Sequence, residues 1–171
     1  MQELNLWLSE VKRVFPKLIR KSISVDYKSI SKKKLGYVKA KIEQKLDFDA
    51  ESLLLGQKTE MKKQLKIPSD YKIFINQELL KIKNTALRRQ IVQHILIHEL
   101  LHIENHDLIT LSKDYNRRKQ KKIHLDECEN EIFKRFNQLR ALDNIMEIEK
   151  REHLEIAISR ILEGINWFEK K

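Results

Sequence analysis

The spacing of apolar residues predicts a helix at the start of the chain, followed by two strands. In residues 2–20, large apolar side chains recur every three to four positions, which is the helical period. Pro16 interrupts this pattern and is expected to kink or end the helix, because proline lacks a backbone N–H donor. Residues 22–30 and 35–46 instead alternate apolar and polar side chains and contain β-branched residues, so each predicts a strand.

The middle of the chain combines a third strand with a long helix. Residues 71–76, YKIFIN, form a short β-type run, and a short helix is expected before them, beginning near Asp49. Residues 84–112 carry apolar side chains at helical spacing, and Asn84 or Thr85 can cap that helix. This helix is the longest element that the pattern predicts.

Two further amphipathic helices are expected in the last third of the chain. A basic connection, residues 113–124, leads to the segment ECENEIFKRFNQLRALDNI, which Asp126 can cap. Residues 145–170 have the same helical spacing of apolar positions. The whole pattern predicts an α+β fold in one domain, residues 1–171, with a small antiparallel or mixed sheet of about three strands packed on the two central helices.

Composition favours a globular intracellular protein. Hydrophobic residues make up 41% of the 171 residues and charged residues 35%, with only 3 glycines and 2 prolines, which favours long regular elements. A single cysteine, Cys128, allows no intramolecular disulfide and is expected to be a small buried apolar residue. The N-terminus lacks a secretory h-region and no apolar run is long enough to span a bilayer, so a cytoplasmic location without membrane contact is predicted.

The formal net charge of +10 raises the question of a nucleic-acid partner. Much of the charge lies in local runs, which can bind phosphates but more often form a solvated surface. These runs are Lys32–Lys34, Lys62–Lys63 and Arg117–Lys122. Along the sequence they show no interleaving with aromatic residues that would favour base stacking. Nucleic acid is therefore the lesser partner hypothesis.

The long central helix carries four histidines at intervals of four residues: His94, His98, His102 and His106. Two of them belong to the string His98-Glu99-Leu100-Leu101-His102, which has the HExxH form. On a helix, His98 and His102 share one face and can both bind one metal ion. Glu99 lies about 100° further round the helix, where it can contact an attacking water without binding the metal. This arrangement is typical of a catalytic zinc site with Glu99 as the general base.

A catalytic zinc needs a third protein ligand. His106 lies one more turn along, but three side chains on one straight helix cannot readily surround a tetrahedral ion. The next helix is the better source, after a connection of 24 residues between His102 and Glu127. Glu127 is the preferred ligand, and Glu131, on the same helix face, can hydrogen-bond a metal-bound histidine. Glu131 or Glu129 as the ligand, or an acidic turn that only complements the helix dipole, are the alternatives.

These motifs resemble those of a known family of peptidases. HExxH followed by a glutamate on a later helix resembles the gluzincin clan of zinc metallopeptidases. The segments IFINQELL (73–80), HELLHIENHDLITL (98–111) and ECENE (127–131) are similar to the core of membrane peptidases of the HtpX and CAAX-prenyl-protease type. Those show a strand, then HExxHxxNxD, then ExxAD. Asn105 and Asp107 fill the N and D positions, Glu127 the ligand position, and Glu131 replaces the usual aspartate.

The chain departs from the membrane peptidases because it has no membrane helices. It therefore resembles the minigluzincins, small soluble archaeal proteins that keep only the catalytic scaffold. The resemblance covers roughly residues 71–140. It implies a zincin-like fold, Zn²⁺ as cofactor, and a site in which Asn105, Asp107 and Glu131 surround the ligands. It further implies that the strand YKIFIN lies along the cleft and pairs with an extended substrate. His124 and Tyr115 are candidate donors to the oxyanion.

Three functions remain open from the sequence. The first is a soluble zinc endopeptidase that hydrolyses unfolded or flexible peptide, with Glu99 transferring the proton of the attacking water. The second is a zinc-binding scaffold that is inactive or held latent, either by its own C-terminal segment, residues 143–171, or by oligomerisation. The third is a DNA-associated metalloprotease, suggested by the basic runs.

Overall fold

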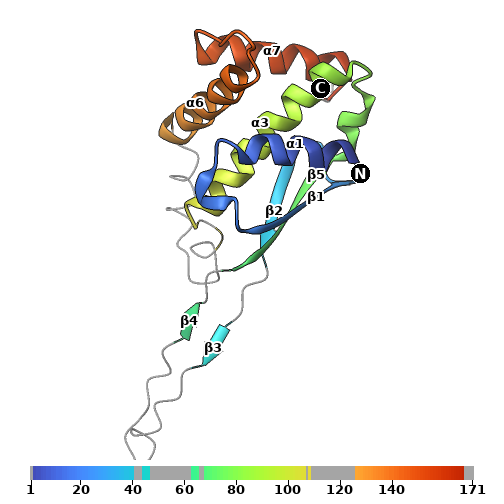
Figure 1. Cartoon of the computed structure of the whole chain (residues 1–171). Helices are drawn as coiled ribbons and strands as arrows, with labels where there is room; N and C mark the ends of the chain where they lie inside the picture. Colours follow the sequence, from blue (N-terminus) through green and yellow to red (C-terminus); the bar gives the residue numbers. More distant parts are fainter. Residues whose placement is uncertain are drawn as a thin grey trace, which may run out of the picture.

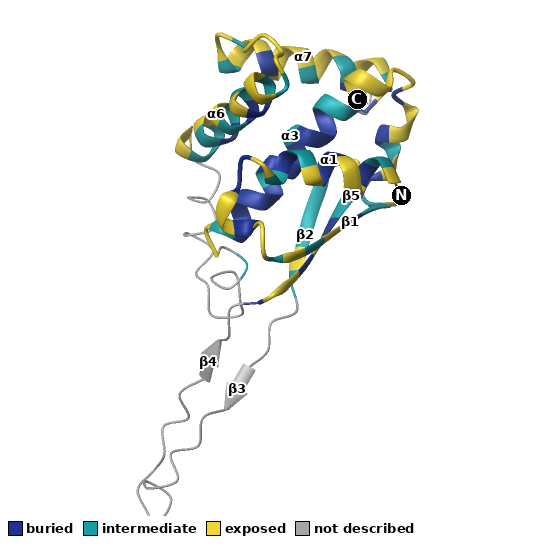
Figure 2. Ribbon diagram, in the orientation of Figure 1, coloured by how far each residue is buried: buried dark blue, intermediate teal, exposed yellow. Residues whose placement is uncertain are grey.

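The computed structural model describes residues 2–40, 44–46, 63–65, 68–106, 108 and 126–167. In this part of the chain, the helices gather on one face of a small sheet (Figure 1). The central helix, α3, is covered by other elements over most of its length and forms the middle of the core (Figure 2). The predicted α+β class and a sheet of three strands are therefore confirmed.

The chain begins with α1 (Gln2–Lys12), which packs on β1 and α3. Its buried face is made of Leu4, Trp7, Leu8 and Val11. The helix predicted over 2–20 ends at Lys12, and a short 3₁₀ turn, η1 (Pro16–Leu18), follows. Pro16 stands at the first position of that turn, where its missing N–H costs no hydrogen bond.

The three-stranded sheet has the order β1-β5-β2, built from β1 (Ser22–Lys28), β5 (Asp70–Asn76) and β2 (Gly36–Ala40). β1 runs parallel to β5, and β2 runs antiparallel to it. The strand predicted over 35–46 is two strands, since β3 (Gln44–Leu46) pairs separately with β4 (Lys63–Leu65). The short helix predicted from Asp49 lies outside the described residues.

The strand YKIFIN, predicted to pair with substrate, is β5 at the centre of the sheet. Its backbone hydrogen-bonds β1 on one side and β2 on the other, over the full registers of both pairs. The prediction that this strand binds an extended peptide is therefore wrong, because no edge of it is left for a further strand. A hydrophobic run is equally compatible with a central strand and an edge strand, so only the topology could decide.

Strand β2 lies against the middle of α3, and Gly36 permits this close approach. A Cβ atom added at Gly36 would lie 2.7 Å from Cγ2 of Ile95 and 3.0 Å from the carbonyl oxygen of Phe74. The missing side chain thus brings the backbone of β2 close to the helix that carries the HExxH motif.

Helix α3 (Thr85–Glu104) begins as predicted, with the Asn84 side chain accepting a hydrogen bond from the Leu87 N–H at 3.1 Å. It ends well before residue 112, the predicted end. Asn105 is the C-terminal cap, and His106 adopts a left-handed conformation with φ 59°. Buried apolar residues occur all round the helix, which is why its sequence lacks a clear polar face.

The last two helices are α6 (Asp126–Leu142) and α7 (Arg151–Gly164), and a short 3₁₀ turn, η2 (Gln77–Lys81), links β5 to α3. α6 packs on α3 through a buried stripe of Ile132, Phe136 and Leu139. α7 is shorter than the predicted 145–170 and buries Leu154 and Leu162, followed by Trp167. Of the helices that the structure describes, none is both long and apolar enough for a bilayer span.

Candidate functional site

His98 and His102 lie one turn apart on α3, and their side chains converge. Their Nε2 atoms are 3.1 Å apart, and the ring planes are inclined by 76°. A zinc ion bound by two imidazoles at about 2.0–2.1 Å in tetrahedral geometry places the two nitrogens roughly 3.3 Å apart. The spacing of this pair therefore fits two ligands of one ion, as the helical spacing of HExxH predicts.

Glu99 points to the neighbouring strand, β2. The backbone N–H of Val38 donates a hydrogen bond to its carboxylate, and only 6% of Glu99 is exposed. Burial raises the pKa of Glu99 to about 7, while the Val38 hydrogen bond and the charge of Lys34 oppose that rise. The side chain is thus a buried carboxyl group next to the histidine pair, poised to gain or lose a proton near neutral pH.

His94 lies one turn before His98 and packs against α6. Its ring meets that of Phe136 edge-on, at 5.9 Å between centroids. Burial lowers the pKa of His94 to about 4, so the ring is neutral at neutral pH. His94 is therefore a packing residue beside the histidine pair.

The low pKa of His94 predicts an acid-dependent loss of stability. The unfolded chain binds a proton at this histidine below pH 6.5, whereas the folded chain does so only near pH 4. Folding is thus penalised as the pH falls through this window, by roughly 1–3 kcal/mol, given that part of the side chain remains exposed. As the pH falls from 7.5 to 4.5, we expect the unfolding free energy of His94→Leu to rise by that amount relative to that of the wild type. The measurement is urea unfolding of the metal-free protein.

The difference between the two proteins is the informative quantity, because other titrating groups contribute to both. Glu99 affects stability in the opposite direction. Because its pKa is raised, Glu99 stabilises the folded state at low pH, and this stabilisation is lost as the pH rises from 4.5 to about 7. A difference in unfolding free energy that does not change with pH would show that His94 binds a proton as readily in the folded state as in the unfolded chain, which would contradict this prediction.

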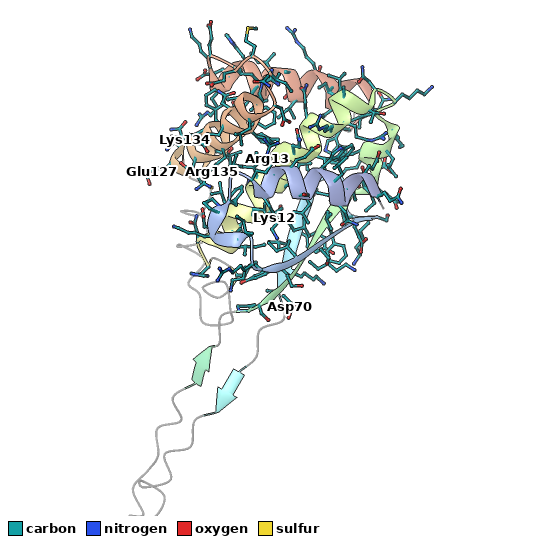
Figure 3. The ribbon with its side chains drawn as sticks, viewed as in Figure 1. Lys12, Arg13, Asp70, Glu127, Lys134 and Arg135 are labelled. Atoms are coloured by element: carbon teal, nitrogen blue, oxygen red, sulfur yellow. The ribbon has the colours of Figure 1, made fainter. Side chains whose placement is uncertain are left out.

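Glu127 lies in the first turn of α6 and is exposed. Figure 3 shows it at the outer end of that helix. Within the described part of the chain, no three histidine, cysteine, aspartate or glutamate side chains form a group that could hold a metal ion, so the structure does not bring Glu127 together with His98 and His102. Its role as third ligand stays a prediction.

Glu131 is held by Arg135, a residue that the sequence analysis missed. The Nε atom of Arg135 donates to Glu131 at 2.7 Å, and a second nitrogen contacts Glu104 of α3 at 3.1 Å. Arg135 also donates to the carbonyl of Val14 and lies over the ring of Phe15. It therefore joins α6 both to α3 and to the segment between α1 and η1. The i, i+4 spacing of Glu131 and Arg135 was the available signal. A hydrogen bond from Glu131 to a metal-bound histidine stays a prediction.

The other predicted site residues are less informative. Asn105 and His106 are both exposed at the end of α3. Cys128, which was expected to be buried, is only partly buried and packs against the core. Three residues lie outside the described part of the chain: Asp107, Tyr115 and His124.

The C-terminal segment contacts α6 at one end and the β1–β2 connection at the other. The histidine face of α3 lies between α6, which His94 contacts, and β2, which Glu99 contacts. At one end of α7, Arg151 reaches Asn130 of α6 at 3.1 Å. Just beyond its other end, the carbonyl of Asn166 accepts a hydrogen bond at 3.3 Å from Lys32, in the connection that precedes β2. The C-terminal segment thus joins the two sides of the candidate site.

Comparison with known families, with curated proteins and with solved structures gives no match to this chain.

Proposed function

We propose that this chain is a zinc-dependent endopeptidase acting on unfolded or flexible peptide. The observation that carries the proposal is the pair of Nε2 atoms of His98 and His102, 3.1 Å apart, with the Glu99 carboxyl buried beside them. Two imidazoles and a neighbouring carboxyl group on one helix are the residues that zinc hydrolases use.

The mechanism divides between the ion and the chain. Zinc held by His98 and His102 would polarise the scissile carbonyl and acidify water. Glu99 would take the proton of the attacking water and pass it to the leaving amine. Before a substrate binds, the N–H of Val38 holds the carboxyl of Glu99 in position. In this proposal Glu127 approaches the histidines and supplies the third ligand.

An extended substrate would pair with β2 instead of β5. In the three-stranded sheet, β2 has β5 on one side and is the edge strand on the other. Its Val38 contacts Glu99, so a peptide added along this edge would lie next to the proposed base. The main-chain hydrogen bonds of such a pairing do not depend on side chains, which suits a protease for unfolded protein.

Metal analysis of purified variants tests the proposed ligand set. We expect about one zinc per chain in the wild type, and loss of zinc in His98→Ala, His102→Ala and Glu127→Ala. His106→Ala is the matched control, because His106 is exposed just beyond the end of the same helix; this variant is expected to retain the metal. Zinc retained in Glu127→Ala but lost in His106→Ala would overturn the ligand set. Hydrolysis of a denatured protein that continues in excess chelator would overturn the reaction.

A latent form of this enzyme is the second candidate, and the course of α7 favours it. Glu99 is 6% exposed and His102 9%, whereas His98 is half-buried, so access to the proposed base is restricted in this conformation. α7 is attached on both sides of the histidine face, through Arg151 and through Asn166. Release of this helix would then be the step that permits substrate binding.

A further inference from the structure

The face of the sheet that points away from the helices carries a group of aromatic and basic side chains. The contacts between helices and strands, of α1 with β1 and of α3 with β2 and β5, all involve the other face. Since side chains alternate along a strand, the buried Val25, Ile73 and Ile75 point to the helices, and their neighbours in sequence point outward. In Figure 1 the labelled helices lie on the opposite side of the three-stranded sheet.

Two aromatic rings lie side by side in the middle of this outer face. Tyr37 of β2 and Phe74 of β5 are directly opposite each other in the strand register. Their ring centroids are 5.0 Å apart and their planes are inclined by 34°. Both residues are partly exposed. Together they form an aromatic platform on a flat sheet, a position where such side chains contribute little to the core.

Three lysines surround this platform. The Lys28 ammonium lies 4.9 Å from the centroid of the Phe74 ring, Lys72 lies 5.4 Å from the same centroid, and Lys39 lies 5.8 Å from that of Tyr37. Lys72 also pairs with Asp26 at 2.7 Å. The outer face therefore combines stacking surface with excess positive charge.

We propose that this outer face binds a single strand of nucleic acid, whose bases stack on Tyr37 and Phe74 while Lys28, Lys39 and Lys72 pair with its phosphates. Proteins that bind single strands without sequence preference use this combination of aromatic side chains and a basic groove. The proposal rests on the sheet alone and is independent of the proposed zinc site. It restores the nucleic-acid partner that the linear sequence disfavoured, because strand pairing brings aromatic and basic residues together from three separate segments.

A single strand fits this face better than other anionic partners. A duplex keeps its bases stacked inside and would leave the two rings unused. An anionic lipid surface favours apolar side chains that project into it, whereas these rings lie between lysines on a flat sheet. On binding, the lysines would exchange their contacts with the rings for contacts with phosphates, which vacates the ring faces for bases.

Fluorescence anisotropy with the full chain tests the proposal. The probes are labelled 12-nucleotide strands of deoxythymidine and of uridine, a duplex of equal length, and vesicles containing phosphatidylglycerol. At low salt we expect a Kd on the order of micromolar for both single strands, similar to each other because no contact to the sugar is involved. The duplex should bind at least about tenfold more weakly, since it offers no free bases. For three lysine–phosphate contacts, a plot of the logarithm of the association constant against the logarithm of the salt concentration should have a slope of about −2.

Paired variants separate stacking from charge. Tyr37→Leu and Phe74→Leu should each weaken single-strand binding about tenfold, whereas Tyr37→Phe and Phe74→Tyr, which keep a ring, should preserve it. Lys39→Gln should reduce the salt slope by about 0.7. Lys150→Gln, which removes one exposed charge from the segment before α7, is the control and should leave both quantities unchanged.

Four results would overturn the proposal. The first is no single-strand binding at low salt, and the second is an equal loss of single-strand binding in Lys39→Gln and Lys150→Gln. The third is unchanged binding in both Tyr37→Leu and Phe74→Leu, in proteins that circular dichroism shows to be folded. The fourth is binding of the vesicles in preference to the single strands.

Discussion

Replacing Glu99 by glutamine is expected to leave zinc bound and to lower peptide hydrolysis by about 10²–10⁴-fold, the range for loss of a general acid–base residue. Glutamine keeps the shape of the side chain and can still accept the hydrogen bond from the Val38 N–H, but it cannot take a proton from water. The measurement is kcat/KM on an internally quenched peptide, with zinc content determined on the same samples.

Glu104→Gln is the matched control, because Glu104 is the other carboxylate of α3 and pairs with Arg135, away from the proposed proton transfer. Its hydrolysis rate should stay within a few-fold of the wild type at a temperature where both are folded. If Glu99→Gln were as active as the wild type, and chelation still abolished that activity, Glu99 would not be the base and another proton acceptor would be required.

Undocking α7 is expected to raise peptide hydrolysis by about tenfold or more, since the helix joins both sides of the histidine face. Leu154→Asp places a charge in the buried side of α7, where 6% of Leu154 is exposed. Burying an unpaired carboxylate is strongly unfavourable, so the helix should detach and not carry the charge into the core. The measurement is the rate of peptide hydrolysis of the variant beside the wild type, with limited proteolysis to locate the released segment.

Ile156→Asp provides a close control on the same helix. Because Ile156 is 49% exposed, this substitution introduces the same charge at the surface. It should leave the rate unchanged. A wild type already as active as Leu154→Asp would rule out latency through α7. If α7 of the Leu154→Asp variant stayed protected from proteolysis and the variant hydrolysed peptide as slowly as the wild type, the charge would be accommodated without release of the helix. A truncation before Arg151 would then be the decisive variant.

The elements of the fold followed from the sequence where local spacing governs them. The capping of α3 by Asn84, the position of β1 and the existence of α6 were all predicted from residues within a few positions of each other. The pairing of His98 with His102 has the same origin, because i, i+4 spacing on any helix brings two side chains to one face. Boundaries were less accurate: Lys12 and Glu104 end their helices earlier than the apolar pattern does.

The order of the strands, and what surrounds the histidine pair, depended on contacts between distant segments. YKIFIN became the central strand because both β1 and β2 pair with it, and no feature of the six residues themselves requires that. Likewise, Arg135 reaches Glu104 and Val14 only because α6 packs beside α3 and near the segment that follows α1.

By itself, the sequence determined the helix that carries His98, Glu99 and His102 and the direction in which those side chains point, since both are set by the helical repeat. The tertiary structure decided which strand lies next to Glu99, that α7 joins the two sides of the site, and that Tyr37 lies opposite Phe74. These relations depend on which distant segments pack together, and that choice is made by the burial of apolar surface across the whole chain and not by local periodicity.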